Sequence, residues 1–149
     1  MITDGEEAGL RGCKSWAKNH YDEYVNSGVE TVVLCVDTLT DREYLRVYNK
    51  DMTGTVKNNQ QFSQLVMDAS KDAGHDDIEL SSVFFGSSDA AAFSQAGITA
   101  TCLAAMDPRP ADYYHNRRDT ADRLVPETIK TGFDVIISTI LNFDEKGLN

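Results

Sequence analysis

The chain has 149 residues, of which 24 are acidic and 14 basic, so its formal charge at pH 7 is −10. This length fits one domain that can bury a hydrophobic core. The negative charge argues against nucleic acid or an anionic membrane surface as a partner and favours a peptide or a small molecule. No apolar run approaches the roughly 18 residues of a membrane span.

Two adjacent carboxylates, Glu6 and Glu7, stand near the beginning of the chain, between a strand-like start and a predicted helix. Neighbouring charges of one sign repel unless a positive group lies close to them. A metal ion would supply that charge, with one carboxylate as its ligand and the other taking a proton from metal-bound water. The alternative is a pair of solvated acids in the first turn of a helix, where the macrodipole favours them.

Hydrophobic periodicity in the first half predicts a helix, two strands and a second helix. An amphipathic helix is expected over residues 10–20. The unbroken apolar run 31–36 is typical of a strand covered on both faces of a parallel sheet. The alternating segment 44–48 predicts an edge or half-exposed strand, and a helix with a cap at Asn58 or Asn59 is expected to end near Ala73.

The second half continues the alternation of strands and helices. A short segment over 78–85 leads through a small-residue turn to a helix over 90–96, and a strand follows over 98–104. A polar, proline-containing loop precedes a helix over about 126–143, whose apolar stripe is expected to cover the sheet. That stripe consists of Ile129, Phe133, Ile136, Ile137 and Ile140.

The order of these elements predicts an α/β fold. We expect a three-layer α/β/α domain with a mainly parallel central sheet. Cys13, Cys35 and Cys102 are predicted to be free thiols because two of them lie in apolar runs, which is unlike a disulfide framework. Free thiols favour a reducing compartment, and so a cytoplasmic location.

Several candidate functional residues follow strands or lie in the loops that leave them. Asp37 ends the run 31–36, and ligands of open parallel sheets bind at the carboxyl ends of strands. Asp89 and His115 stand in loops of the same kind. Two carboxylate ligands, one histidine and one further glutamate suit a hydrolytic zinc site, although each residue alone also has an ordinary structural explanation, such as an Asp that opens a turn.

Four motifs give the chain a recognisable pattern. They are GEEAGLRG at 5–12, VDTLT at 36–40, SSDAAAF followed by AGI at 87–98, and YHNRRDTAD at 114–122. With these motifs in this order, the chain resembles the co-catalytic di-zinc aminopeptidases of the bacterial leucyl aminopeptidase type. That family also contains glutamate carboxypeptidase and glutaminyl cyclase relatives.

The resemblance implies a role for each matching residue. Glu6 would be the general base that deprotonates the water bridging two zinc ions. Glu7 and His115 would ligate one zinc, and Asp37 would ligate the other. Asp89 would line the site or contact a metal-ligating residue without binding the metal itself, and Tyr114 would line the substrate pocket.

The chain also departs from the family pattern. Asn116 stands where the family often has Thr, which leaves the ligand His115 intact. The family's remaining ligands, a His and an Asp that bridges both metals, lie well upstream of the double Glu and have no counterpart in this sequence. Residues 1–149 are therefore expected to form the carboxyl-terminal part of a zinc-peptidase catalytic domain, with an incomplete sheet.

The resemblance predicts a metal-dependent exopeptidase, an aminopeptidase acting on peptides. Two alternatives remain, namely a non-catalytic interaction or dimerisation module on the same fold, and a single-zinc acyltransferase of the glutaminyl-cyclase kind. By itself the chain is expected to bind zinc weakly and to be inactive. An open sheet edge left by the missing half is expected to drive homo-oligomer formation.

Overall fold

The computed structural model describes residues 1–107, 109 and 112–148. Within these residues the chain forms helices and strands, with 3₁₀ turns at Arg42–Tyr44 and Ala121–Arg123. The α-helices are α1 (Arg11–Tyr24), α2 (Gln60–Asp72), α3 (Asp89–Gln95) and α4 (Pro126–Lys146). The strands are β1 (Val33–Asp37), β2 (Leu45–Asp51), β3 (Val56–Lys57), β4 (Glu79–Ser82) and β5 (Ala100–Ala105). No helix in the described ranges combines the length and the apolar character needed to cross a membrane.

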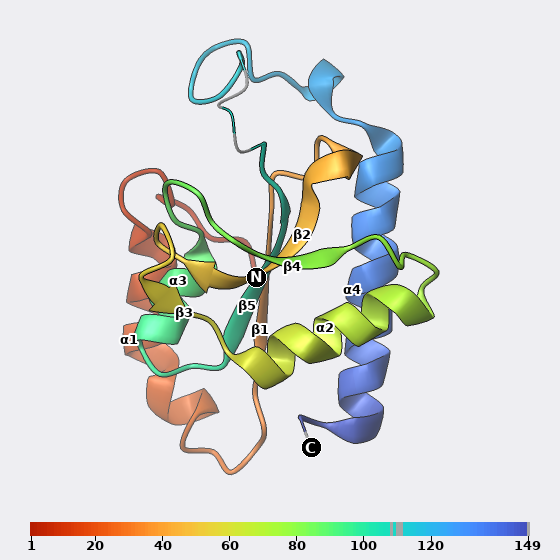
Figure 1. The fold of residues 1–149 in the computed structure, drawn as a ribbon. Helices are drawn as coiled ribbons and strands as arrows, with labels where there is room; N and C mark the ends of the chain where they lie inside the picture. Colours follow the sequence, from red (N-terminus) through yellow and green to blue (C-terminus); the bar gives the residue numbers. More distant parts are fainter. Residues whose placement is uncertain (108, 110–111, 149) are drawn as a thin grey trace.

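The strands form one sheet in the order β1-β5-β2-β3, and β4 also pairs with β2. Helices α1 and α3 cover one face of the sheet, and α2 and α4 cover the other (Figure 1). The predicted α/β class with a sheet between helical layers is therefore confirmed. The pairing is mixed, since β1/β5 and β2/β4 are parallel whereas β2/β5 and β2/β3 are antiparallel.

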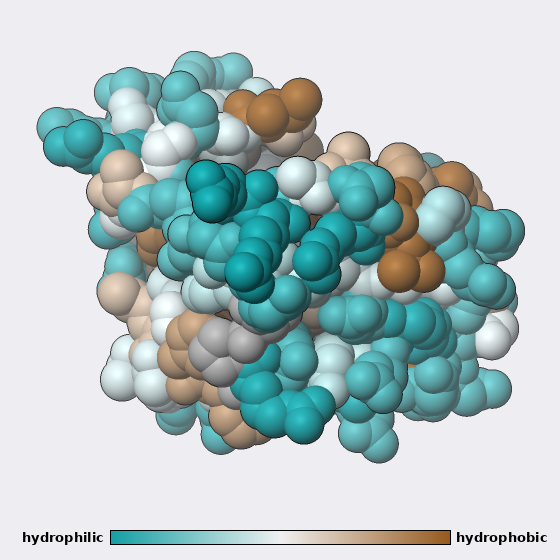
Figure 2. All heavy atoms as spheres, turned by 90° about the horizontal axis from the view of Figure 1, so that it is seen from above, coloured by the Kyte–Doolittle hydropathy of each residue, from teal (hydrophilic) through white to brown (hydrophobic). Residues whose placement is uncertain are grey.

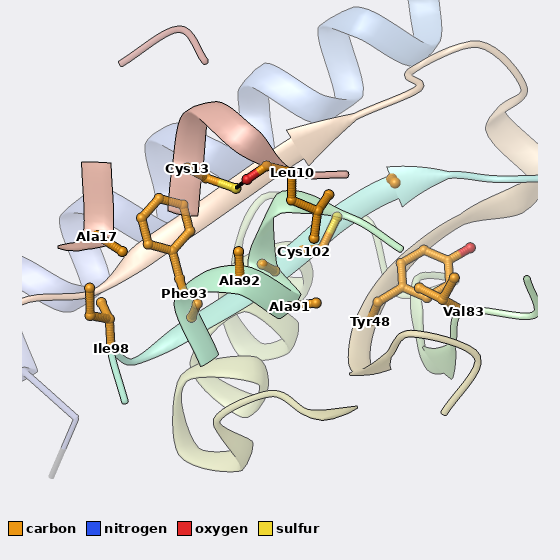
Figure 3. Packing of buried hydrophobic residues seen from close by; sticks show 13 residues of the cluster. Leu10, Cys13, Ala17, Tyr48, Val83, Ala91, Ala92, Phe93, Ile98 and Cys102 are labelled. Carbon is orange, nitrogen blue, oxygen red and sulfur yellow. Dashed lines mark hydrogen bonds between the residues drawn. The ribbon is translucent and has the colours of Figure 1, made fainter. Parts of the chain in front are cut away.

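Strand β5 lies in the middle of the sheet, and its side chains divide the core into two clusters. Ala100, Cys102 and Ala104 face α1 and α3, where they join the cluster of Figure 3. Leu103 and Ala105 face α2 and α4. All six residues of the strand are buried, as expected for small and apolar side chains between two helical layers.

The prediction that segment 44–48 forms an edge or half-exposed strand is wrong. It belongs to β2, which extends to Asp51 and pairs with β3, β4 and β5. Leu45, Val47 and Tyr48 are almost completely buried. The alternation of polar and apolar residues suggested a solvated face, but Arg46 is only partly exposed and donates a hydrogen bond of 2.8 Å from its guanidinium to the Leu45 carbonyl.

The prediction that the apolar stripe of the last helix covers the sheet holds only for part of that stripe. Ile136 packs against the core on this side of the sheet, and Ile129 is half-buried. Phe133, Ile137 and Ile140 are exposed. The face of α4 that packs on the sheet and on α2 is instead rich in threonine, whose hydroxyls can bond to the helix backbone, as Thr139 does to the Val135 carbonyl at 2.7 Å. The buried positions of α4 are Thr128, Thr131, Gly132, Val135 and Thr139.

Candidate active site

A cavity of about 540 Å³ opens where β1 and β5 end. Its walls come from the amino-terminal segment, from the residues that follow β1 and β5, and from loops 84–87 and 113–115. Figure 2 looks down on this end of the molecule, where hydrophilic side chains predominate and apolar ones form separate patches. The predicted site residues among its lining are Glu6, Glu7, Asp37, Tyr114 and His115.

Glu7 and His115 are in direct contact across this cavity. The Oε2 atom of Glu7 lies 2.8 Å from Nε2 of His115, and both side chains are more than half exposed. His115 adopts a left-handed backbone conformation with φ of 56°. Its ring stacks on that of Tyr114 at a centroid distance of 3.8 Å. The structure therefore brings together the two residues that the resemblance assigns to one zinc.

The segment that carries Glu6 and Glu7 has no regular structure and is held by the first turn of α1. The carbonyl of Glu6 accepts hydrogen bonds from the N–H groups of Gly9 and Leu10 at 3.0 and 2.8 Å. The N–H of Gly12 donates to the Asp4 carbonyl at 3.0 Å. A Cβ atom at Gly12 would lie 2.3 Å from that oxygen, so only glycine permits this approach.

Glu6 lies among other acids, and this changes its proton affinity. Its pKa is raised from 4.5 to about 7, chiefly by partial burial and then by the negative charge of Glu7, Asp37 and Asp89. At neutral pH this carboxyl is therefore able both to take up and to release a proton. That is the property expected of a general base and acid.

Asp37 is the last residue of β1 and lines the same cavity as Glu6 and Glu7. Its Oδ1 atom accepts a hydrogen bond of 3.0 Å from the hydroxyl of Thr38. Thr38 has a positive φ of 45°, so the chain turns sharply as it leaves the strand. The carboxylate of Asp37 lies at the carboxyl end of β1, as predicted from the sequence.

Asp89 does not line this cavity but borders a neighbouring groove beside β1, which Glu6, Glu7 and Asp37 also line. One of its oxygens accepts from the Thr3 hydroxyl, and the other accepts from the Cys13 thiol at 2.8 Å. Burial, followed by the hydrogen bond to Asp89, raises the pKa of Cys13 to about 12. Asp89 thus ties the amino-terminal segment and α1 to the start of α3. The cysteines are free thiols, as predicted.

Asp51 is a buried acid that the sequence analysis missed. Its carboxylate accepts hydrogen bonds from the N–H and hydroxyl of Ser88, the hydroxyl of Ser87 and the N–H of Met52. The side chain of Ser88 in turn caps α3 by accepting from the Ala90 N–H. Asp51 ends its strand, as Asp37 does, and that shared position was the signal that could have identified it.

Aromatic side chains form part of the cavity wall. Phe85 meets Tyr114 edge to face at a centroid distance of 5.6 Å, a favoured arrangement of aromatic rings. Phe84 and Met106 also line the cavity. The cavity therefore combines acidic groups with apolar surface, a combination typical of ligand sites.

The donor atoms present match zinc in kind. Carboxylate oxygen and imidazole nitrogen are common zinc ligands. In the described part of the chain, however, no three His, Cys, Asp or Glu residues form a group that could hold a metal ion. Glu7 and His115 are two donors of this kind that the structure brings into contact.

Comparison with known proteins identifies the family of this chain. The model of peptidase family M28 matches residues 1–140. The chain belongs to this family. No curated protein sequence matches it closely.

Several solved structures have the same fold. The LapA aminopeptidase of Legionella pneumophila aligns with a TM-score of 0.76 and 18% identity, over 94% of this chain and 37% of its own. The zinc aminopeptidase BSAP of Bacillus subtilis aligns with a TM-score of 0.76 and 19% identity, over 97% and 34%. A glutaminyl cyclase from an Acidobacteriales bacterium aligns with a TM-score of 0.70 and 17% identity, over 93% and 47%. The chain thus spans about a third to a half of the length of these relatives.

Proposed function

We propose that this chain contributes the general base and three of the metal ligands to a zinc aminopeptidase. The observation that carries the proposal is the contact between Glu7 and His115, which lies beside Glu6 and Asp37 in a single cavity. Membership of peptidase family M28 supports the same reaction class.

In this proposal Glu7 and His115 would hold one zinc ion, and Asp37 would hold the second. Zinc, when bound, acidifies water and polarises the scissile carbonyl. Glu6 takes a proton at its carboxylate and returns it to the leaving amine, for which a pKa near neutrality is suitable. The aromatic wall at Phe85 and Tyr114 would receive the amino-terminal side chain of the substrate.

The same proposal implies that the chain by itself is a poor metal binder. A catalytic zinc usually has three protein ligands, whereas this chain offers two for one ion and one for the other. Without a further ligand the affinity should be weak. Peptidase activity should then remain at background, because no acidified water is available to Glu6.

Zinc titration of the purified chain tests this proposal. We expect weak binding of at most one zinc per chain, which is lost in Glu7→Gln. Glu23→Gln is the matched control, because Glu23 forms the other exposed Glu–His contact, 2.9 Å from His20 and outside the cavity. Two tightly bound zinc ions per chain, with release of amino-terminal residues at roughly 1 per second or faster, would contradict the incomplete ligand set. Weak binding that persists in Glu7→Gln would contradict the site.

Glutaminyl cyclisation is the second candidate, since the cyclase neighbour shares the fold over 93% of this chain. The two reactions are distinguished by incubating a peptide that begins with glutamine with a longer protein that contains this chain and the missing zinc ligands. An aminopeptidase releases free glutamine, and a cyclase leaves the peptide blocked by a pyroglutamyl residue. If neither product forms in a complete, zinc-loaded protein, the non-catalytic module remains.

A further inference from the structure

Asp51 is a buried acid near the cavity that has no part in the proposed reaction. It ends β2, and its side chain is completely buried. Strand β4 lies next to β2 and runs parallel to it, so the segments that follow these two strands leave the sheet at the same edge. The segments are the turn 52–55 and the loop 84–88. Asp51 lies where they meet.

The turn 52–55 has an unusual backbone conformation. Met52, Thr53 and Gly54 have positive φ angles of 46°, 55° and 80° in succession. Only glycine adopts such angles at no steric cost, and other residues keep them where surrounding contacts impose them. Within the turn, the N–H and the hydroxyl of Thr55 donate to the Met52 carbonyl at 3.1 and 2.6 Å. The shape of the turn also depends on the contact of Met52 with Asp51.

The carboxylate of Asp51 joins the turn 52–55 to the loop 84–88. Its Oδ1 atom accepts from the N–H of Met52 at 2.7 Å, from the N–H of Ser88 at 3.0 Å and from the hydroxyl of Ser87 at 3.2 Å. Its Oδ2 atom accepts from the Ser88 hydroxyl at 2.5 Å. Hydrogen bonds to a carboxylate are stronger than those between neutral groups. One buried side chain therefore holds the two segments at a fixed separation.

Both segments form part of the cavity wall. The turn contributes Met52, Thr53 and Thr55, and the loop contributes residues 84–87. Neither segment contains a charged side chain, so together they present apolar and hydroxyl surface to a ligand in the cavity. Glu7 and His115 line the same cavity. The space beside this pair of residues thus depends on the position of a wall that Asp51 holds.

We propose that Asp51 is a positioning residue, which fixes this wall and thereby determines which amino-terminal side chains the cavity accepts. The proposal rests on the proposed function, because it assigns the cavity to the first residue of a peptide. Asp51 does not itself line the cavity and acts through the residues that it holds. Without its carboxylate, Met52 and Thr53 would relax toward negative φ angles and leave their places in the wall.

Two amino-acid amides that differ only in their side chain test the proposal on the zinc-free chain. Leucinamide and glycinamide carry the same amine and amide groups, so the ratio of their dissociation constants measures the contribution of the side chain. NMR titration in the presence of a chelator gives both constants. We expect the unmodified chain to bind leucinamide about tenfold more tightly than glycinamide, because the wall removes the leucine side chain from water.

Two substitutions of Asp51 separate its hydrogen bonds from its charge. In Asp51→Asn, the amide oxygen can still accept from Met52 and Ser88, and the NH₂ group can donate to the Ser88 hydroxyl. The tenfold preference should therefore change by less than about twofold. Asp51→Ala removes every acceptor, and the preference should fall by about fivefold or more, while the binding of glycinamide changes by less than about twofold.

Asn58→Ala is the matched control for a loss of stability alone. Asn58 is also buried and joins distant elements, since it donates to the Tyr48 carbonyl and accepts from the Ser94 hydroxyl, both at 2.7 Å. It lies outside the cavity wall, so the preference for leucinamide should stay unchanged. Ser88→Ala is a second test variant, which keeps the Ser88 N–H and loses one of the hydrogen bonds to Asp51. It should lower the preference by about twofold and decides the matter if circular dichroism shows that Asp51→Ala is unfolded.

The proposal is overturned if the unmodified chain binds both amides equally, or if neither Asp51→Ala nor Ser88→Ala lowers the preference. An equal loss in Asn58→Ala would attribute the effect to lower stability, and an equal loss in Asp51→Asn would attribute it to charge. Either result would also overturn it. None of these measurements involves zinc or turnover. A preference that depends on Asp51, in a chain whose zinc titration fails, would therefore count against the peptidase reaction and not against the positioning role.

Discussion

The side chains of Glu7 and His115, which come from the first and the last third of the chain, meet at 2.8 Å. Both are well exposed, and exposed ion pairs stabilise proteins by only about 0.2–1 kcal/mol. His115→Ala should therefore lower the free energy of unfolding by no more than about 1 kcal/mol while abolishing zinc binding. Urea unfolding and zinc titration of the same samples check this, with His20→Ala as the control. A much larger decrease in the free energy of unfolding would contradict the prediction and mean that the contact between Glu7 and His115 stabilises the fold.

Glycine at position 12 permits the close approach of the amino-terminal segment to α1. Alanine in a helix normally stabilises by about 0.5–1 kcal/mol relative to glycine. Gly12→Ala should instead destabilise by about 2 kcal/mol or more, because its Cβ would meet the backbone oxygen of Asp4 at 2.3 Å. Gly132→Ala is the matched control, since its nearest obstacle is the flexible end of Leu39, and it should cost less. Chemical unfolding measures both, and equal effects would contradict the prediction.

The buried carboxylate of Asp51 should contribute strongly to stability. Asp51→Ala would leave the N–H and hydroxyl of Ser88 and the N–H of Met52 without their acceptor. Unpaired buried polar groups cost about 1–3 kcal/mol each, so we expect a loss of at least about 3 kcal/mol. Asp68→Ala, at an exposed position on α2, should change stability by less than about 0.5 kcal/mol. A small effect of Asp51→Ala in urea unfolding would show that water replaces the carboxylate.

Glu6 is expected to destabilise the zinc-free protein at neutral pH. Its pKa is raised from 4.5 to about 7, so the fold favours the protonated form, and this contribution to stability is lost as the pH rises through that interval. Glu6→Gln should therefore be as stable as the unmodified chain near pH 4 and more stable above pH 7. Because water screens the partly exposed carboxyl, we expect a gain of about 1 kcal/mol. Thermal melting with a chelator, at several pH values, measures it. A gain that is independent of pH would contradict this account of the charge cluster.

The sequence predicted which residues gather at the site better than it predicted the sheet around them. Asp37 and His115 line one cavity because the chain segments that follow adjacent parallel strands share one edge, and Glu6 and Glu7 reach the same cavity from an irregular segment held against α1. The interior position of β2, which pairs with three other strands, could not be predicted, since strand order depends on pairing between distant segments. Asp51 was missed for a related reason, because its partner Ser88 is near it only after folding.

The face of α4 shows a different limit. Periodicity correctly predicted a helix, but it cannot decide which of two faces turns inward when one consists of isoleucine and phenylalanine and the other of threonine, glycine and valine. Small side chains allow the close packing of Gly132 on Leu39. The larger apolar residues were then left on the surface.

The central strand of the sheet is also the last to be made. Strand β5 is flanked by β1 and β2, both of which leave the ribosome well before it. Until residues 100–105 are synthesised, β1 lacks its partner in the described sheet and β2 lacks one of its neighbours, so the nascent chain must carry apolar strands without a hydrogen-bonding partner. Production of this protein in cells should therefore depend on chaperones during the second half of translation, and chains that stop before β5 should be insoluble.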